Sequence, residues 1–105
     1  MPSIEIYRVR IDPGDAERLL EIRAAAVAEF REQVPELLSA DLVRLTDDVW
    51  LDILRWSDAV DSERIAAAAE CTPISAEMHG LIADELGHDR GELVHSTDHA
   101  WARAR

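Results

Sequence analysis

An acidic residue inside an otherwise apolar run is the first candidate for chemistry in this 105-residue sequence. Residues 49–56 read VWLDILRW, which places Asp52 among apolar neighbours. A carboxylate in such a position either pairs with an arginine, for which Arg8, Arg44 and Arg55 are candidates, or acts on a bound ligand. In the second case it serves as a base toward an acidic substrate or as its hydrogen-bond partner.

Three aromatic side chains and one histidine are the other candidates for a site. Trp50 and Trp56 combine a large apolar body with one N–H donor, so we expect at least one in the core and one beside a ligand. Tyr7 offers a phenolic donor, with a hydroxyl group in water as the alternative. His79, next to Met78, is a candidate for proton transfer, with a hydrogen-bonded structural histidine as the alternative.

Other kinds of site have little support in the sequence. The histidines and aspartates near the C-terminus lack a recognised metal-ligand spacing, and they are His88, Asp89, His95, Asp98 and His99. Cys71 is the only cysteine, which excludes an internal disulfide. Neither a glycine-rich phosphate loop nor a nucleophile-elbow motif is present. We therefore expect no metal, no bound cofactor and no hydrolase chemistry.

The charge of the chain limits its partners. It contains 22 acidic residues against 11 basic ones, all of them arginine, for a formal net charge of -11. Such a surface repels nucleic acid and anionic lipid, and the absence of lysine excludes Schiff-base chemistry. The N-terminus lacks a basic region followed by an apolar run, and no stretch is long enough to span a bilayer, so we expect a cytoplasmic protein.

The spacing of apolar residues predicts the elements that position these side chains. Alternation over residues 3–11 predicts a strand, and Asp12 with Pro13 marks the start of a helix that Pro35 ends. Residues 40–46 and 49–56 read as a strand hairpin around Asp47 and Asp48. The helix stripe consists of Leu19, Leu20, Arg23, Ala26, Val27, Phe30 and Val34.

Helical patterns return in the second half of the chain. The alanine-rich residues 61–70 form one predicted helix. A second helix begins with Thr72 as its cap, carries a stripe of Ile74, Met78, Leu81 and Ile82, and ends at Gly87. Residues 91–97 are a weakly patterned strand. We expect one domain over residues 1–97, followed by a C-terminal tail over residues 98–105.

The resulting order β-α-β-β-α-β predicts an α+β, ferredoxin-like fold: a four-stranded antiparallel sheet with its helices on one face. Residues 49–56 indicate what covers the other face. Val49, Leu51 and Ile53 alternate with residues that are also largely apolar, as in a strand covered on both sides. A two-fold copy of the chain is the simplest cover, so we expect a homodimer.

At this point the sequence resembles the antibiotic biosynthesis monooxygenase-like group of the dimeric α+β barrel superfamily. The likeness is carried by residues 49–57, a strand that ends in Trp56 and Ser57, by the alanine-rich helix, and by residues 73–82. The element order covers about residues 3–97. The resemblance implies a homodimer whose two sheets close a barrel, and a pocket in each subunit between sheet and helices.

The resemblance also implies roles for individual residues. Trp50, Asp52, Leu54 and Trp56 would face the pocket, Met78 would help to line it, and His79 and Tyr7 would be proton-transfer partners. Members that oxidise polyphenolic anthrones without metal or flavin have a polar strand residue four positions before a tryptophan. Here this pair is Asp52 and Trp56, but the family residue at the polar position is asparagine.

The implied function is a cofactor-independent monooxygenase acting on an aromatic or polyketide-like small molecule. Two alternatives share the fold: a non-catalytic domain that binds a small hydrophobic ligand or a protein partner, and a lactone-type isomerase. The haem-degrading members are a poorer match, because their pattern uses an asparagine and a helical tryptophan that this chain lacks. Only His79 falls near a matching place.

Overall fold

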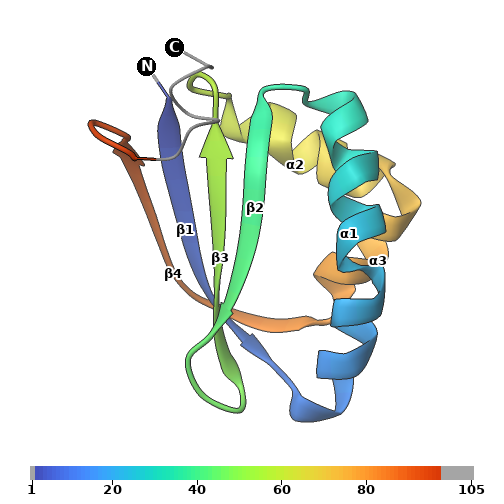
Figure 1. The fold of residues 1–105 in the computed structure, drawn as a ribbon. Coiled ribbons are helices and arrows are strands. Elements are labelled where there is room, and N and C mark those ends of the chain that lie inside the picture. Colours follow the sequence, from blue (N-terminus) through green and yellow to red (C-terminus); the bar gives the residue numbers. More distant parts are fainter. Residues whose placement is uncertain (1, 98–105) are drawn as a thin grey trace.

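The computed structural model describes residues 2–97 as a sheet with helices on one face (Figure 1). The four strands are antiparallel and lie in the order β2-β3-β1-β4. This confirms the ferredoxin-like α+β fold predicted from the sequence. In chain order the elements are β1 (Ser3–Ile11), the 3-10 turn η1 (Pro13–Asp15), α1 (Ala16–Gln33), β2 (Leu37–Arg44), β3 (Val49–Trp56), α2 (Ser62–Cys71), α3 (Pro73–Gly80) and β4 (Ile82–Glu92).

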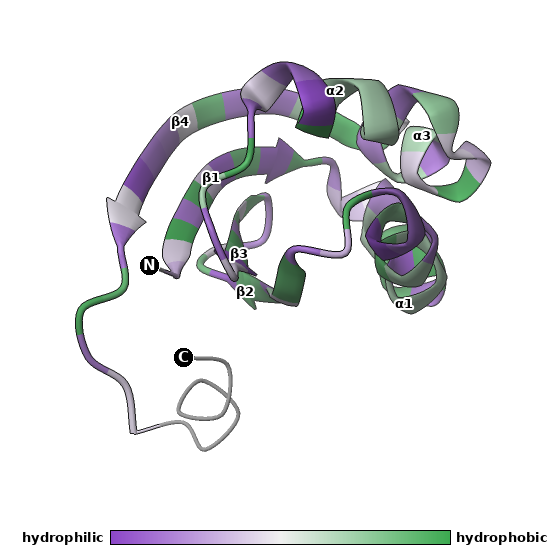
Figure 2. Ribbon diagram, turned by 90° about the horizontal axis from the view of Figure 1, so that it is seen from above, coloured by the Kyte–Doolittle hydropathy of each residue, from purple (hydrophilic) through white to green (hydrophobic). Residues whose placement is uncertain are grey.

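Successive residues of β1 point to opposite faces of the sheet, and apolar residues, green in Figure 2, occur at both parities along the strand. Glu5, Val9 and Ile11 are buried toward the helices. In the β1–β3 register Tyr7 lies opposite Asp52 and Val9 opposite Trp50. Because directly opposed residues share a face, this register gathers the predicted site residues of β1 and β3 under the helices.

The helical segment starts after Asp12 as predicted, but its first turn is the 3-10 turn η1, and α1 itself begins at Ala16. The Asp12 side chain accepts a hydrogen bond from Gly14 N at 2.9 Å, and α1 ends at Gln33, two residues before Pro35. The buried stripe differs at one position, because Ile22 is buried whereas Leu20 is 53% exposed. The remaining buried residues of this helix are Leu19, Ala26 and Phe30.

The C-terminal part of the sheet differs from the prediction. Helix α3 ends at Gly80 rather than at Gly87, and β4 spans Ile82–Glu92 instead of residues 91–97. β4 pairs with β1 through two register irregularities, between Arg8 and Val9 and between Arg10 and Ile11. The backbone pairing with β1 is what makes this segment a strand, because its residues are mostly polar and exposed.

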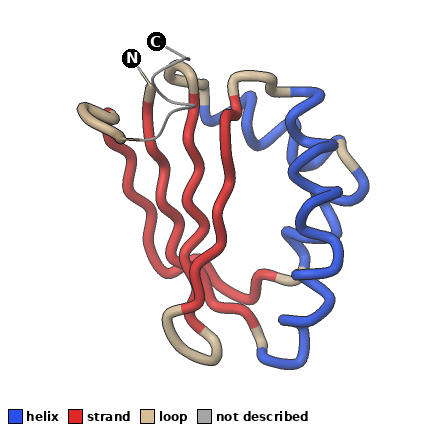
Figure 3. The backbone as a smooth tube through the Cα atoms, in the orientation of Figure 1, coloured by secondary structure: helices blue, strands red, loops and turns tan. Residues whose placement is uncertain are grey.

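Helices α1, α2 and α3 all lie on one side of the sheet, and no helix formed by residues 2–97 lies on the other side (Figure 3). Two clusters of buried side chains join the layers. One is centred on Leu19, Ile22 and Trp50, and the other on Phe30, Val34 and Trp56.

None of the described helices has both the length and the apolar character needed to cross a membrane.

Candidate functional site

A cavity of about 530 Å³ lies between the sheet and the helices. Its apolar lining includes Phe30, Leu37, Leu54 and Ile65. Polar groups enter it from both layers: Tyr7, Asp52 and Glu85 from the sheet, and Arg23, Ser62, Glu70, Ser75 and His79 from the helices. An apolar cavity with a few convergent polar groups is the usual form of a small-molecule site.

Asp52 forms an ion pair with Arg23 of α1. Arg23 Nη2 donates to Asp52 Oδ1 at 2.7 Å and Nη1 donates to Oδ2 at 3.0 Å. The two side chains are 13% and 14% exposed, respectively. The partner is therefore not one of the expected residues Arg8, Arg44 and Arg55. Those three lie on strands, whereas Arg23 lies on the helix that covers this face of the sheet. The same ion pair accounts for the presence of Arg23 within the otherwise apolar stripe of α1.

This pairing changes what Asp52 can do. Both of its oxygens accept a charge-assisted hydrogen bond, the strong form of this interaction, so the carboxylate is held against Arg23 rather than presented alone to the cavity. Arg23 Nη1 also lies 3.5 Å from Met78 Sδ. A guanidinium has five N–H groups, and Asp52 uses only one from each terminal nitrogen. The second N–H of Nη1 is directed at Met78 Sδ, so Nη2 and Nε each keep one N–H, and Arg23 lines the cavity.

His79 lies in the last turn of α3, where its Nδ1 is 2.7 Å from the carbonyl oxygen of Ser75. A carbonyl only accepts, so Nδ1 carries the proton of this hydrogen bond. In the neutral ring Nε2 is then an acceptor. His79 also lines the cavity, which makes it the described histidine best placed to take a proton from a ligand.

Tyr7 lines the cavity and donates its hydroxyl proton to Glu5 Oε2 at 3.1 Å. Burial raises the pKa of Tyr7 well above its usual range, and the charge of Glu5 adds to this effect. Glu5 itself is 0% exposed. It was not among the sequence candidates, although its parity along β1 places it on the same face as Tyr7 and Val9.

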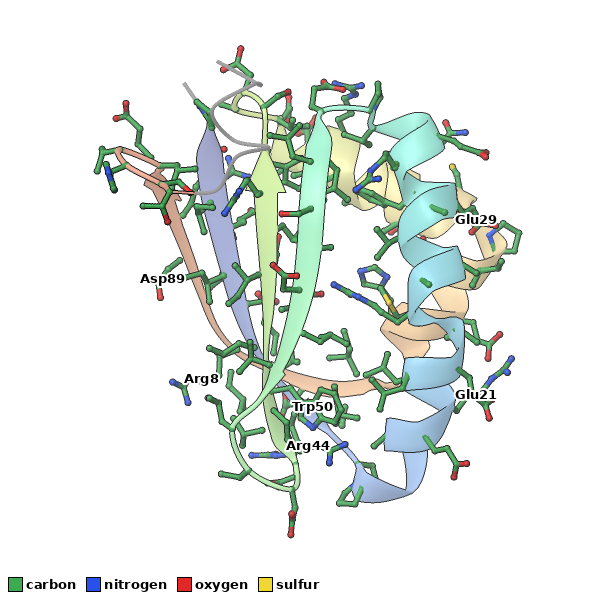
Figure 4. All side chains as sticks on the ribbon, in the orientation of Figure 1. Arg8, Glu21, Glu29, Arg44, Trp50 and Asp89 are labelled. Atoms are coloured by element: carbon green, nitrogen blue, oxygen red, sulfur yellow. The ribbon has the colours of Figure 1, made fainter. Side chains whose placement is uncertain are left out.

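Trp50 and Trp56 are buried but do not line the cavity. Trp56, 1% exposed, donates from Nε1 to Glu5 Oε1 at 3.1 Å and contacts Phe30 edge to face. Trp50 is 3% exposed, and its Nε1 has no hydrogen-bond partner among the described residues. The guanidinium of Arg44 lies 4.6 Å from the Trp50 ring centroid, and both are labelled in Figure 4. Of the residues expected to face or line the pocket, Asp52, Leu54 and Met78 do so.

Within residues 2–97, no group of three or more histidine, cysteine, aspartate or glutamate side chains is arranged to hold a metal ion. Of the C-terminal candidates, His88 instead contacts Glu5, with Nε2 2.8 Å from Oε2. Asp98 and His99 lie outside the described residues, as does the predicted tail.

No protein-family profile matches the sequence, and no curated protein matches it significantly. The structure resembles a candidate antibiotic biosynthesis monooxygenase from Bordetella bronchiseptica, with a TM-score of 0.71 and 15% identity over 89% of this chain and 97% of the other. A second candidate monooxygenase, from Chloroflexus aurantiacus, has a TM-score of 0.62 and 19% identity over 93% and 98%.

SnoaB, a cofactor-independent oxygenase from Streptomyces nogalater, is also similar, with a TM-score of 0.59 and 16% identity over 91% of this chain and 96% of that one. At these identities the likeness concerns the fold. The chain has the fold of antibiotic biosynthesis monooxygenase-like structures, which is the fold that the resemblance of residues 49–57 and 73–82 implied.

Proposed function

We propose that this chain is a cofactor-independent monooxygenase that oxidises an aromatic or polyketide-like small molecule in the cavity between sheet and helices. The observation that carries the proposal is the cavity itself, whose mostly apolar lining includes the nearly buried Arg23–Asp52 pair and the solvent-exposed His79. The fold, shared with a cofactor-independent oxygenase, supports this reading.

The reaction begins with loss of a proton from an acidic phenol or from the CH₂ group of an anthrone. His79 Nε2 takes the proton, and the remaining N–H groups of Arg23 bind the enolate oxygen. Asp52 holds the guanidinium in position rather than acting as the base. The carbanion then reduces O₂ and forms a C–O bond. Loss of water from the resulting hydroperoxide leaves a carbonyl, so one oxygen atom enters the product and the other leaves as water.

Oxygen uptake with 1,8-dihydroxyanthrone as the probe tests this function. We expect uptake above the protein-free rate, with one atom of ¹⁸O from ¹⁸O₂ in the product. His79→Gln should lower kcat about 100-fold, the usual size of a general-base contribution. His95→Gln, a histidine outside the cavity, is the matched control. Equal rates for the two variants would exclude His79 as the base, and uptake no faster than without protein would exclude the function.

One observation favours a second function, ligand binding without catalysis. Both oxygens of Asp52 are held by Arg23, so the residue with the best sequence support as a base is occupied. A protein of this kind would bind the anthrone with a measurable dissociation constant but would show no oxygen uptake. Calorimetry on the same preparation therefore separates the two functions.

The proposal includes a homodimer formed through the outer face of the sheet. Cross-strand pairing places Ile4 and Ile6 of β1 and Leu51 and Ile53 of β3 on this face, away from the helices. Each of these side chains is only partly buried within one chain. A second copy would cover them with the same surface, as two-fold symmetry requires.

A further inference from the structure

Glu5 is a buried carboxylate that the proposed reaction does not use. It is 0% exposed and lies on β1 two residues before Tyr7. Donors from three strands converge on it. Trp56 Nε1 of β3 lies 3.1 Å from Oε1, whereas Tyr7 Oη, His88 Nε2 and Arg90 Nη2 lie 3.1, 2.8 and 2.8 Å from Oε2.

These donors keep the carboxylate ionised despite its burial. Burial alone raises the pKa of Glu5, but hydrogen bonds from Arg90, His88 and Tyr7, together with the charge of Arg90, outweigh it and leave the pKa below its usual range. A carboxylate is an acceptor only. Every group around Glu5, including the Tyr7 hydroxyl, must therefore point its proton at it.

The ring of Tyr7 is held as firmly as its hydroxyl. His88 stacks on it with ring centroids 4.3 Å apart and planes 2° from parallel. With its only O–H proton directed at Glu5, the phenolic oxygen has just its lone pairs left for other partners. Tyr7 is also the member of this group that lines the cavity.

We infer that Glu5 is a positioning residue that fixes Tyr7 as a hydrogen-bond acceptor toward the cavity, so that the ligand bound there must donate a hydrogen bond. The inference rests on the proposed function, because it concerns the ligand of the same cavity. It adds a requirement for the ligand that the proposed function does not contain, namely a hydrogen-bond donor at the position of Tyr7. A hydroxyl-bearing aromatic fits this end of the cavity, whereas its methyl ether or its carboxylate analogue does not.

The first test needs no ligand, because Tyr7 is the only tyrosine in the chain. Absorbance at about 295 nm follows tyrosinate formation and so reports the ionisation of this one side chain. The groups that act on it are Glu5 and Glu85, which raise its pKa beyond the effect of burial, and Arg90, which lowers it. His88 stacks on its ring, and Asp52 lies opposite it on β3.

In the wild type Tyr7 should stay un-ionised at a pH where an ordinary phenol has lost its proton. Glu5→Gln removes the negative charge at nearly constant size, so Tyr7 should ionise at a pH at least about 1 lower. Glu32→Gln, on the exposed surface of α1, is the control and should change nothing. Circular dichroism over the same pH range must show that the protein is still folded. An unchanged titration in Glu5→Gln would overturn the role of Glu5.

The second test compares 2-naphthol with 2-methoxynaphthalene and 2-naphthoate by calorimetry. We expect the wild type to bind 2-naphthol roughly five- to tenfold more tightly than its methyl ether, the value of one hydrogen bond. Tyr7→Phe keeps the ring but removes the acceptor, so it should erase this preference while leaving the affinity for the ether unchanged. 2-Naphthoate has no proton to donate to Tyr7, so Tyr7→Phe should leave its affinity unchanged as well.

The outcomes separate this inference from the proposed function. If the wild type binds the naphthol and its ether equally, or if Tyr7→Phe keeps the preference, the rule that the ligand must donate is wrong. If no aromatic probe binds, the proposed function of the cavity fails instead, and the tyrosine titration still decides whether Glu5 controls Tyr7. Should Glu5→Gln fail to fold, Tyr7→Phe tests the acceptor role by itself.

Discussion

The ion pair between Arg23 and Asp52 links the two layers of the fold at the level of single residues. Arg23 comes from α1 and Asp52 from β3, and each side chain is about one-seventh exposed or less. A pair of this kind adds little stability compared with two apolar side chains. Replacing only one of the two residues should be strongly destabilising, because the other charged group is then buried without a partner. The pair therefore makes the two residues strongly interdependent.

We expect Arg23→Met to lower the free energy of unfolding by about 2–4 kcal/mol, because it leaves the Asp52 carboxylate unpaired. The double variant Arg23→Met with Asp52→Leu should recover most of this loss. Urea denaturation at pH 7 measures all four members of the cycle. Additive effects of the two substitutions would show that the residues are not coupled.

The pH dependence of stability gives a second prediction at this scale, for Glu5. Its pKa in the folded chain is below the ordinary value of 4.5. The unfolded chain therefore takes up the proton first as the pH falls. The stability contributed by the ionised carboxylate is fully present above about pH 5 and is lost as the pH falls through the folded pKa.

Glu5→Gln cannot titrate at this position, so it should be less stable than the wild type at pH 7 by about 1–3 kcal/mol. The difference in unfolding free energy between the two proteins should narrow between pH 5 and the acid unfolding transition. Over this range the wild type loses the stability contributed by the ionised Glu5, which the variant lacks at every pH. Denaturant unfolding at a series of pH values measures it. A gap that stays constant down to that transition would contradict the lowered pKa.

At the scale of elements, α3 depends on a side chain from α1. Thr72, predicted as the cap, instead donates its hydroxyl to the carbonyl oxygen of Ala68 at 2.8 Å. The amides at the start of α3 are bound by Glu29, whose Oε1 accepts from Ile74 N at 2.8 Å and from Ser75 N at 3.2 Å. An anion at this end is also favoured by the helix dipole.

Glu29→Gln should therefore cost about 1 kcal/mol of stability, since the neutral amide keeps one acceptor but loses the charge. Backbone amide exchange should become faster at the start of α3 and stay unchanged in β1. Glu21→Gln is a matched control, because Glu21 lies on the same helix and its ion-pair partner among the described residues is the exposed Arg18. Equal amide exchange rates at the start of α3 in both variants would mean that Glu29 does not stabilise the N-terminus of this helix.

Local pattern was enough to predict the elements that have one buried face. β1 and β3 are short runs rich in β-branched and apolar residues between turn signals and were predicted to the residue, and α1 is bounded by Asp12 and Pro35. β4 was misplaced, because an edge strand whose residues are mostly exposed has no apolar alternation to detect. Its position is determined by pairing with β1, which lies more than seventy residues earlier in the chain.

The site shows the same limit of sequence reasoning. Asp52, Tyr7 and His79 were predicted because their types are unusual in their surroundings. The partners of these residues were not, since Arg23 and Glu5 reach them only through the packing of α1 on the sheet and the register of β1. One feature of the sequence indicated that Glu5 belongs to the site, namely that it lies on the same face of β1 as Tyr7. Because buried acidic residues are rare, this position was not enough to predict that Glu5 is buried.

For the molecule as a whole, the two faces of the sheet differ in how they are covered. The inner face is packed under the helices, whereas the outer face carries apolar side chains with nothing from the described chain over them. Charged side chains flank this apolar surface: Arg8 and Asp89 extend from it in Figure 4. An apolar centre with a charged border is the usual composition of an interface between protein chains.

We expect the purified protein to have twice the chain mass of 11.8 kDa in solution, with the outer faces of two sheets in contact. Leu51→Arg should weaken this dimer at least about 100-fold, because two-fold symmetry places the buried charge in the interface twice. Leu20→Arg is the matched control, the same change at a leucine that is 53% exposed on α1. Sedimentation equilibrium over a concentration series measures both variants. A wild type that remains monomeric at high concentration, or two variants that dissociate alike, would mean that something other than a second copy covers this face.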